Sequence, residues 1–155
     1  MDGPELCTLP GHLIRRLHQV STQVFAAAMA AQGEDLTPVQ FAMLDTLMTQ
    51  PGLDQASLAR GIGKDRATVG SVAARLERKG LIARQASATD RRAIAVAPTE
   101  AGRALHARLS PVVRALQDDI LPGLSATERA QFSALAARAV AAAEARSDAD
   151  PAAVG

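Results

Sequence analysis

The segment spanning residues 54–102 constrains the fold more than any other part of the chain. It contains two short helical stretches, one following Asp54 and one following Asp65, with a glycine-containing turn between them. Two short strands and the turn that joins them come next, at residues 81–85, 93–97 and 87–92. A helix-turn-helix inserts its second helix into the major groove of DNA, and a basic ribbon beside it can reach the backbone or the minor groove. The pattern therefore predicts a DNA-reading motif followed by a two-stranded ribbon.

Basic residues are concentrated in this same segment. Between Arg60 and Arg92 there are nine basic and three acidic residues, a local net charge of +6, whereas the whole chain carries only +1. Such an excess is expected of a protein that neutralises DNA phosphates and releases their counterions. Because many charge runs are only solvated helix faces, the excess favours nucleic acid in combination with the helix-turn-helix pattern and not by itself.

The N-terminal third is predicted to form two helices. Residues 10–31 place one apolar stripe at the spacing of a buried helix face: Leu13, Leu17, Val20, Val24 and Ala28. Thr37, Pro38 and Gln40 together have the pattern of a capping box with proline in the first turn. A second helix is therefore expected from Pro38 to about residue 49, and residues 1–8 are expected to be loose.

The C-terminal third is also predicted to be helical. Thr99 caps a long helix in which Pro111 is expected to cause a kink or a local break. Ser125 begins a second capping box, which opens an alanine-rich helix ending at about residue 146. Residues 147–155 are expected to be disordered. The predicted fold class is therefore all-α with a small β-ribbon wing.

The second helix of the DNA motif can be oriented from its own sequence. One stripe is apolar and is expected to face the core: Val69, Val72, Ala73 and Leu76. The opposite face presents small and basic residues: Ala67, Thr68, Gly70, Ser71, Ala74, Arg75 and Arg78. Small residues allow deep entry into the major groove, where hydroxyl groups can bond base edges, although an ordinary surface helix is the competing interpretation. We expect the DNA contacts to come from this helix and from the ribbon tip: Lys64, Arg66, Thr68, Gly70, Ser71, Arg75, Arg91 and Arg92.

The motifs of this segment resemble those of the MarR family of winged-helix regulators over about residues 10–145. The strongest matches are Thr68-Val69, Leu76-Glu77, Lys79-Gly80-Leu81-Ile82, Asp90 with Arg92, and Thr99 with Gly102. The resemblance implies that Ser71 and its neighbours touch bases and that Arg92 enters the minor groove. It also implies that Asp90 holds the wing by pairing with an arginine, for which Arg84 is the nearest candidate.

The same resemblance implies a triangular homodimer bound to a pseudo-palindromic operator, most often as a repressor released by a small ligand. Residues 1–155 would form one MarR-like domain, with the winged helix-turn-helix at 37–102 and dimerisation helices at 10–32 and 104–146. The terminal helices independently favour dimerisation, because they are more apolar than one thin winged domain could cover. A two-fold dimer then reads two half-sites on the duplex.

Four basic side chains cluster near the start of the first helix: His12, Arg15, Arg16 and His18. Family members that bind salicylate-like compounds hold the carboxylate with basic residues of the matching helix. Arginine offers a fork that fits a carboxylate, and histidine can bond a ring hydroxyl or nitrogen. We therefore expect a small aromatic carboxylate effector, such as a hydroxybenzoate or hydroxynicotinate. Solvated side chains or inter-subunit salt bridges are the alternative.

Other function classes receive less support. Cys7 raises the possibility of a redox-sensing repressor, but no basic residue that could activate its thiol stands within several positions and the chain lacks tyrosine. The three histidines lack metal-ligand spacing, and neither catalytic motifs nor cofactor motifs are evident, so we expect no enzyme, metal or cofactor. A non-specific architectural DNA-binding protein remains an alternative. The chain has neither a long apolar run nor a signal peptide, which predicts a soluble, cytoplasmic protein without a membrane partner.

Overall fold

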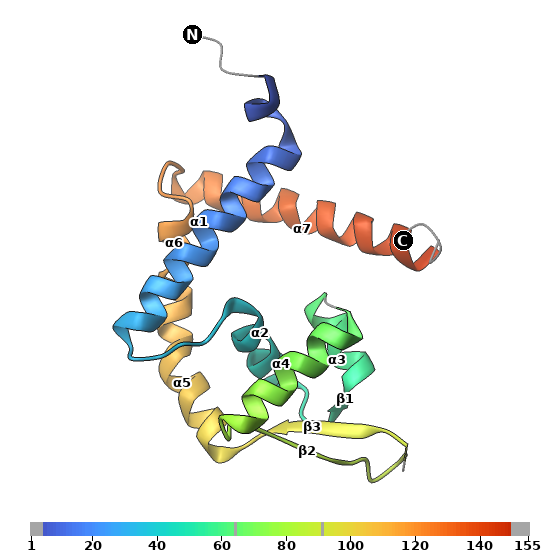
Figure 1. Cartoon of the computed structure of the whole chain (residues 1–155). Helices are drawn as coiled ribbons and strands as arrows, with labels where there is room; N and C mark the ends of the chain where they lie inside the picture. Colours follow the sequence, from blue (N-terminus) through green and yellow to red (C-terminus); the bar gives the residue numbers. More distant parts are fainter. Residues whose placement is uncertain (1–4, 64, 91, 150–155) are drawn as a thin grey trace. The chain divides into compact units, whose positions relative to one another are not determined.

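The computed structural model describes residues 5–63, 65–90 and 92–149, and the chain forms two compact units, residues 1–120 and 121–155 (Figure 1). In chain order the first unit contains η1 (Glu5–Thr8), α1 (Pro10–Ala31), α2 (Pro38–Thr49), β1 (Leu53–Asp54), α3 (Gln55–Ile62), α4 (Arg66–Arg78), β2 (Ile82–Ala86), β3 (Ile94–Pro98), α5 (Glu100–Ala115) and α6 (Gln117–Ile120). The second unit contains α7 (Ala126–Ala149). The expectation of a helical protein with one small β element is confirmed.

Side-chain caps begin the helices where the sequence predicts them. Thr37 Oγ1 accepts a hydrogen bond from the Gln40 amide, and Gln40 Oε1 accepts one from the Thr37 amide, both at 3.2 Å. This reciprocal capping box satisfies two amides that α2 leaves without a partner in its first turn. The helices α3, α4 and α5 are capped by Asp54, Asp65 and Thr99. The side chain of each cap accepts a hydrogen bond from the backbone amide three residues later.

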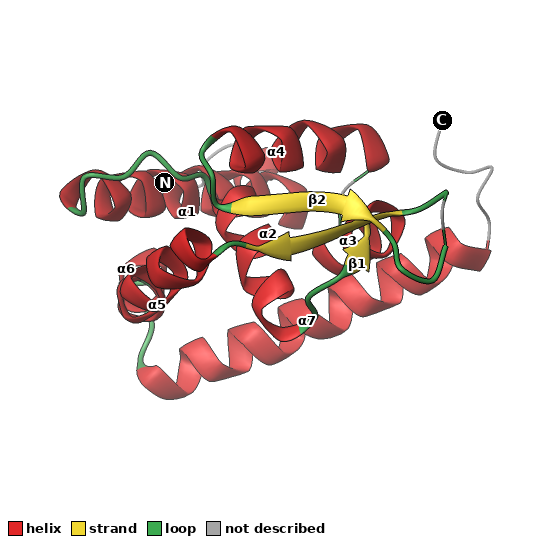
Figure 2. Ribbon diagram, turned by 90° about the horizontal axis from the view of Figure 1, so that it is seen from below, coloured by secondary structure: helices red, strands yellow, loops and turns green. Residues whose placement is uncertain are grey.

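The predicted two-stranded ribbon is present as β2 and β3, and a third antiparallel strand, β1, joins it in the order β1-β3-β2 (Figure 2). The additional strand, β1, pairs Leu53 with Val96 and Asp54 with Ala95. Two residues are too short to show strand periodicity, so only the tertiary pairing with β3 defines this strand. The two longer strands begin and end one residue later than predicted.

The core of the first unit lies between the C-terminal half of α1, the helices α2, α3, α4 and α5, and the sheet. Its largest fully buried side chains are Met29, Met43, Leu44, Leu47, Leu58, Val69, Leu76, Ile82, Val96 and Leu109. Because α4 contributes Val69 and Leu76 to this core, its orientation is set by packing against the other helices and the sheet. The opposite face of α4 is thereby directed away from the core.

The helix α1 has the expected bounds but buries less of its apolar stripe than expected. Phe25 and Met29 are buried, whereas Leu13 and Val20 are exposed. The expected burial of the whole stripe is therefore wrong for this chain taken alone. The apolar core of the first unit contacts only the C-terminal half of the helix, which leaves the N-terminal half uncovered within that unit.

Three other expectations about the helices need correction. Residues 5–8 form the 3-10 helix η1 and are not loose. A local break at Pro111 is not found, because the helix α5 continues through it to Ala115, and a kink at Pro111 stays a prediction. In the second unit, α7 continues to Ala149, so residues 147–149 are helical. Among the described residues, no helix is long and apolar enough to cross a membrane.

Candidate nucleic-acid interface

The helix α4 starts at a turn that only glycine accommodates easily. Gly63, which ends α3, has a φ of 66°, in the left-handed region. Asp65 then caps α4: its carboxylate accepts from the Thr68 amide at 2.9 Å and from the Thr68 hydroxyl at 2.6 Å. These bonds, the hydroxyl bond first, lower the pKa of Asp65. Since the Thr68 hydroxyl hydrogen is already donated, that side chain can offer DNA only its oxygen lone pairs.

The exposed and buried faces of α4 follow the predicted phase. Val69, Ala73 and Leu76 are buried, and Val72 is partly buried against the same core. On the outer side the exposed residues are Arg66, Ala67, Ser71, Arg75 and Arg78. The helix therefore presents a strip of small side chains bordered by guanidinium groups, the shape and charge expected of a helix that enters the major groove.

Gly70 is placed differently from the prediction. Successive residues of a helix are about 100° apart, so Gly70 lies on the flank of α4 between buried Val69 and exposed Ser71. A Cβ atom at Gly70 would lie 3.2 Å from Nε2 of Gln55, the first residue of α3. The centre of the exposed face belongs to Ser71, and Gly70 faces the start of α3.

An ion pair between α4 and β2 holds the base of the wing. Arg84 donates from Nε to Glu77 Oε2 at 3.2 Å and from Nη2 to Glu77 Oε1 at 3.1 Å, a two-pronged arrangement. The guanidinium lowers the pKa of Glu77, mainly through these hydrogen bonds, and the carboxylate raises the pKa of Arg84. The expected pairing of Arg84 with Asp90 is therefore wrong, because Glu77 lies within reach only once α4 packs beside β2.

The tip of the wing is organised by local hydrogen bonds. Asp90 Oδ1 accepts from the Arg92 amide at 2.9 Å, and the Ser87 hydroxyl accepts from the Asp90 amide at 3.3 Å. Arg92 is exposed at this tip. Two predicted contacts, Lys64 and Arg91, lie outside the described residues. The turn thus leaves the Arg92 side chain available to a groove or a phosphate.

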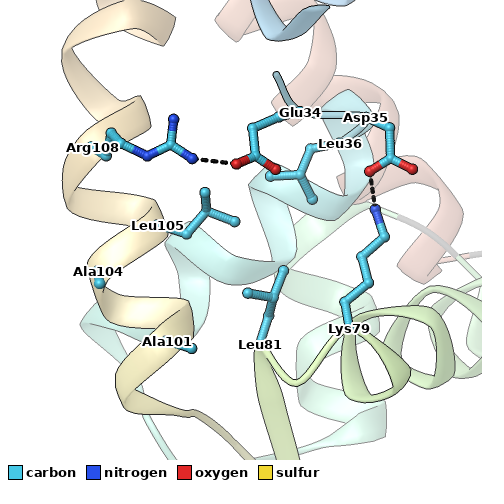
Figure 3. A pocket seen from close by; sticks show the side chains of 9 residues that line it. All are labelled: Glu34, Asp35, Leu36, Lys79, Leu81, Ala101, Ala104, Leu105 and Arg108. Atoms are coloured by element: carbon cyan, nitrogen blue, oxygen red, sulfur yellow. Dashed lines mark hydrogen bonds and ion pairs between the residues drawn. The ribbon is translucent and has the colours of Figure 1, made fainter. Parts of the chain in front are cut away.

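An open groove of about 660 Å³ separates the loop after α1 from α5 and the end of α4 (Figure 3). Its apolar lining includes Leu36, Leu81 and Leu105. Two ion pairs cross its edge: Lys79 with Asp35, and Arg108 with Glu34. The Lys79 hydrogen bond and charge lower the pKa of Asp35. The sequence does not reveal these pairs, since their partners are far apart along the chain.

The four predicted effector residues all lie in the N-terminal half of α1. His12 is half-buried, whereas Arg15, Arg16 and His18 are exposed. Beside them, the apolar side chains of Leu13 and Ile14 are 46% and 66% exposed. This part of α1 therefore combines cationic and apolar surface that the first unit alone does not cover.

Two consecutive helices joined by a tight turn, with a β wing held beside the second, define a winged helix-turn-helix protein. The MarR family model matches residues 36–94, which span α2 to the start of β3. Together with regulators of known structure that are more than 30% identical over most of the chain, this match shows that the chain belongs to the MarR family of winged-helix transcriptional regulators.

Three solved regulators illustrate the likeness. The PcaV regulator from Streptomyces coelicolor, solved with its natural ligand, is 33% identical with a TM-score of 0.82, covering 92% of this chain and 99% of that one. BpsR from Bordetella bronchiseptica, whose DNA binding is regulated by 6-hydroxynicotinic acid, is 27% identical with a TM-score of 0.81 and coverage of 90% and 98%. The repressor CouR, solved on a 23-mer DNA duplex, is 31% identical with a TM-score of 0.79 and coverage of 90% and 98%.

Proposed function

We propose that this protein is a homodimeric transcriptional repressor that binds a pseudo-palindromic DNA operator and is released from it by a small aromatic acid. The observation that carries the proposal is the outer face of α4, where small residues are bordered by Arg66, Arg75 and Arg78, next to a wing with Arg92 at its tip. Small side chains bordered by positive charge fit the major groove, and the DNA-bound relative CouR supports the same use of the fold.

Within this proposal the contacts divide into base-reading and backbone-binding groups. Ser71 is exposed at the centre of α4 and is assigned to base edges, whereas Arg66 and Arg75 are assigned to phosphate or guanine. Arg92 is assigned to the minor groove beside the wing. Lys64, Thr68 and Arg91 stay assigned to the interface without a specific role, whereas Gly70 faces the start of α3 and is assigned no DNA contact of its own.

Dimerisation is proposed to cover the surface that α1 and α7 expose. Leu13 and Ile14 of α1 are exposed, as are Phe132, Leu135 and Val140 of α7. Covering such side chains with a second copy removes apolar area from water, which stabilises association by about 25 cal/mol per Å² before its entropic costs. A two-fold pair of recognition helices would then read two half-sites.

The effector site is proposed to use His12, Arg15, Arg16 and His18. The guanidinium groups of Arg15 and Arg16 suit a carboxylate, the imidazoles can hydrogen-bond a ring substituent, and the neighbouring exposed apolar side chains suit an aromatic ring. BpsR, a relative of the same fold, supports an aromatic acid as the chemical class. A second copy packed against α1 would close this surface into a pocket.

The test begins with selection of a duplex from a randomised pool by the wild-type protein. Affinity for the selected duplex and for a scrambled one is then measured by fluorescence anisotropy, with sedimentation reporting the oligomeric state. Strong preference for the selected duplex, reversed by hydroxybenzoate or 6-hydroxynicotinate, is the expected result. Equal affinity for both duplexes would instead indicate an architectural protein. Release by peroxide, lost in Cys7→Ser, would indicate redox sensing.

A further inference from the structure

The side-chain amide of Gln55 lies against the recognition helix at the one position where that helix has no side chain. A Cβ atom at Gly70 would lie 3.2 Å from Gln55 Nε2, closer than ordinary van der Waals contact. Any other residue at Gly70 would therefore compete with the amide for this space. The pair joins two helices that the turn at Gly63 brings together.

The amide lies on the side of α4 that faces the wing. Positions seven residues apart share a helix face, so Gly70 lies on the same flank as Glu77, which pairs with Arg84 of β2. Gln55 directly follows β1, whose Asp54 pairs with Ala95 of β3. Two independent placements thus put the amide on the side of α4 that is nearest to the sheet and the wing.

The amide is also free to bind. Gln55 is half-buried, and its side chain makes no hydrogen bond to another residue in the described part of the chain. A glutamine amide offers two donor hydrogens and a carbonyl acceptor. Holding a long polar side chain in one place costs rotamer entropy, which a bond to a ligand would offset.

We propose that Gln55 is a further DNA-contacting residue, whose Nε2 donates to a backbone phosphate between the recognition helix and the wing, and that Gly70 keeps the space for it. This inference rests on the proposed DNA-binding function. A side chain on the flank of a helix in the major groove meets the wall of the groove, which is the sugar-phosphate backbone, whereas Ser71 at the centre meets the base edges.

The experiment compares Gln55→Ala, Gly70→Ala and the double variant on the selected duplex and on a scrambled duplex. Gln55→Ala should weaken binding about tenfold to hundredfold on both duplexes, the size of one hydrogen bond to a charged group. Gly70→Ala should weaken binding similarly in the wild-type background and have no further effect in the Gln55→Ala background. Gln117→Ala on α6 is the matched control and should bind like the wild type.

Each outcome decides between the alternatives. A wild-type protein that binds neither duplex refutes the proposed function, whereas a binding wild type with an unaffected Gln55→Ala variant refutes only the role of Gln55. Loss confined to the selected duplex overturns the phosphate assignment, and fully additive losses overturn the role of Gly70. If Gln55→Ala unfolds by circular dichroism, Gln55→Glu replaces it, since an acidic residue suits a helix start. Gln55→Glu should then bind the duplex more weakly than the wild type, most clearly at low salt. An affinity equal to that of the wild type would refute the contact.

Discussion

Gly102 determines how closely α5 approaches the wing, and Gly102→Ala is the sharpest test of the tertiary packing. It is buried in the first turn of α5, and a Cβ atom there would lie 2.0 Å from the Leu81 carbonyl oxygen and 3.4 Å from Leu44 Cδ1. Around it, Thr99 donates its amide to the Leu81 oxygen at 3.0 Å and its hydroxyl to the Gly80 oxygen at 2.6 Å. A methyl group at Gly102 therefore meets backbone that cannot rotate away.

The magnitude of the effect follows from these contacts. Relieving a 2.0 Å approach requires α5 to move by roughly an ångström, which strains the core by about 1–3 kcal/mol. Losing one of the two Thr99 bonds adds about 1 kcal/mol. Alanine is a better helix former than glycine by about 1 kcal/mol, which offsets part of the loss. We expect Gly102→Ala to lower the free energy of unfolding by about 2 kcal/mol, the net of these terms.

Urea unfolding followed by circular dichroism measures this change, provided that protein concentration is held constant for a dimer. Gly61→Ala, in α3, is the matched control, because its Cβ would make only an ordinary contact, 3.7 Å from Cγ2 of Thr46 on α2. That variant should be neutral or slightly more stable. A Gly102→Ala protein as stable as Gly61→Ala would refute the close approach of α5 to the start of β2.

Three further predictions concern the wing, acid stability and the effector. Arg92→Ala should weaken binding to the selected duplex by about 1–3 kcal/mol in gel-shift titrations and leave the sedimentation of the dimer unchanged; unaltered affinity would remove Arg92 from the interface. Because Arg84 lowers the pKa of Glu77 in the folded state, this pair stabilises the protein above the ordinary glutamate pKa, and the contribution disappears as pH falls through the lower folded value. Urea unfolding of Glu77→Gln should consequently lose less stability on acidification than the wild type, and parallel pH profiles would contradict this. Arg16→Ala and His18→Ala should bind DNA normally yet respond less to hydroxybenzoate or 6-hydroxynicotinate in anisotropy titrations, whereas release at the wild-type concentration would place the effector elsewhere.

Features that depend on neighbours along the chain could be predicted from the sequence. The capping box at Thr37 and the carboxylate caps at Asp54 and Asp65 involve residues within three positions, so the local order of residue types specifies them. The phase of α4 is equally local, because apolar residues at helical spacing identify its buried side. For this reason the amino-acid sequence alone is sufficient to predict the winged helix-turn-helix and the exposed position of Ser71.

Features that depend on distant segments were decided only by the tertiary structure. Glu77 is the partner of Arg84 because α4 packs beside β2, although Asp90 is slightly nearer to Arg84 along the sequence than Glu77 is. The strand β1 exists only through pairing with β3, and the approach of Gln55 to Gly70 requires the turn between α3 and α4. Hydrogen bonds and ion pairs between segments depend on the distance after folding, which sequence spacing does not specify. Only local order is encoded in adjacent residues, whereas the contacts that hold the wing and shape the DNA-facing surface arise when the core brings the segments together.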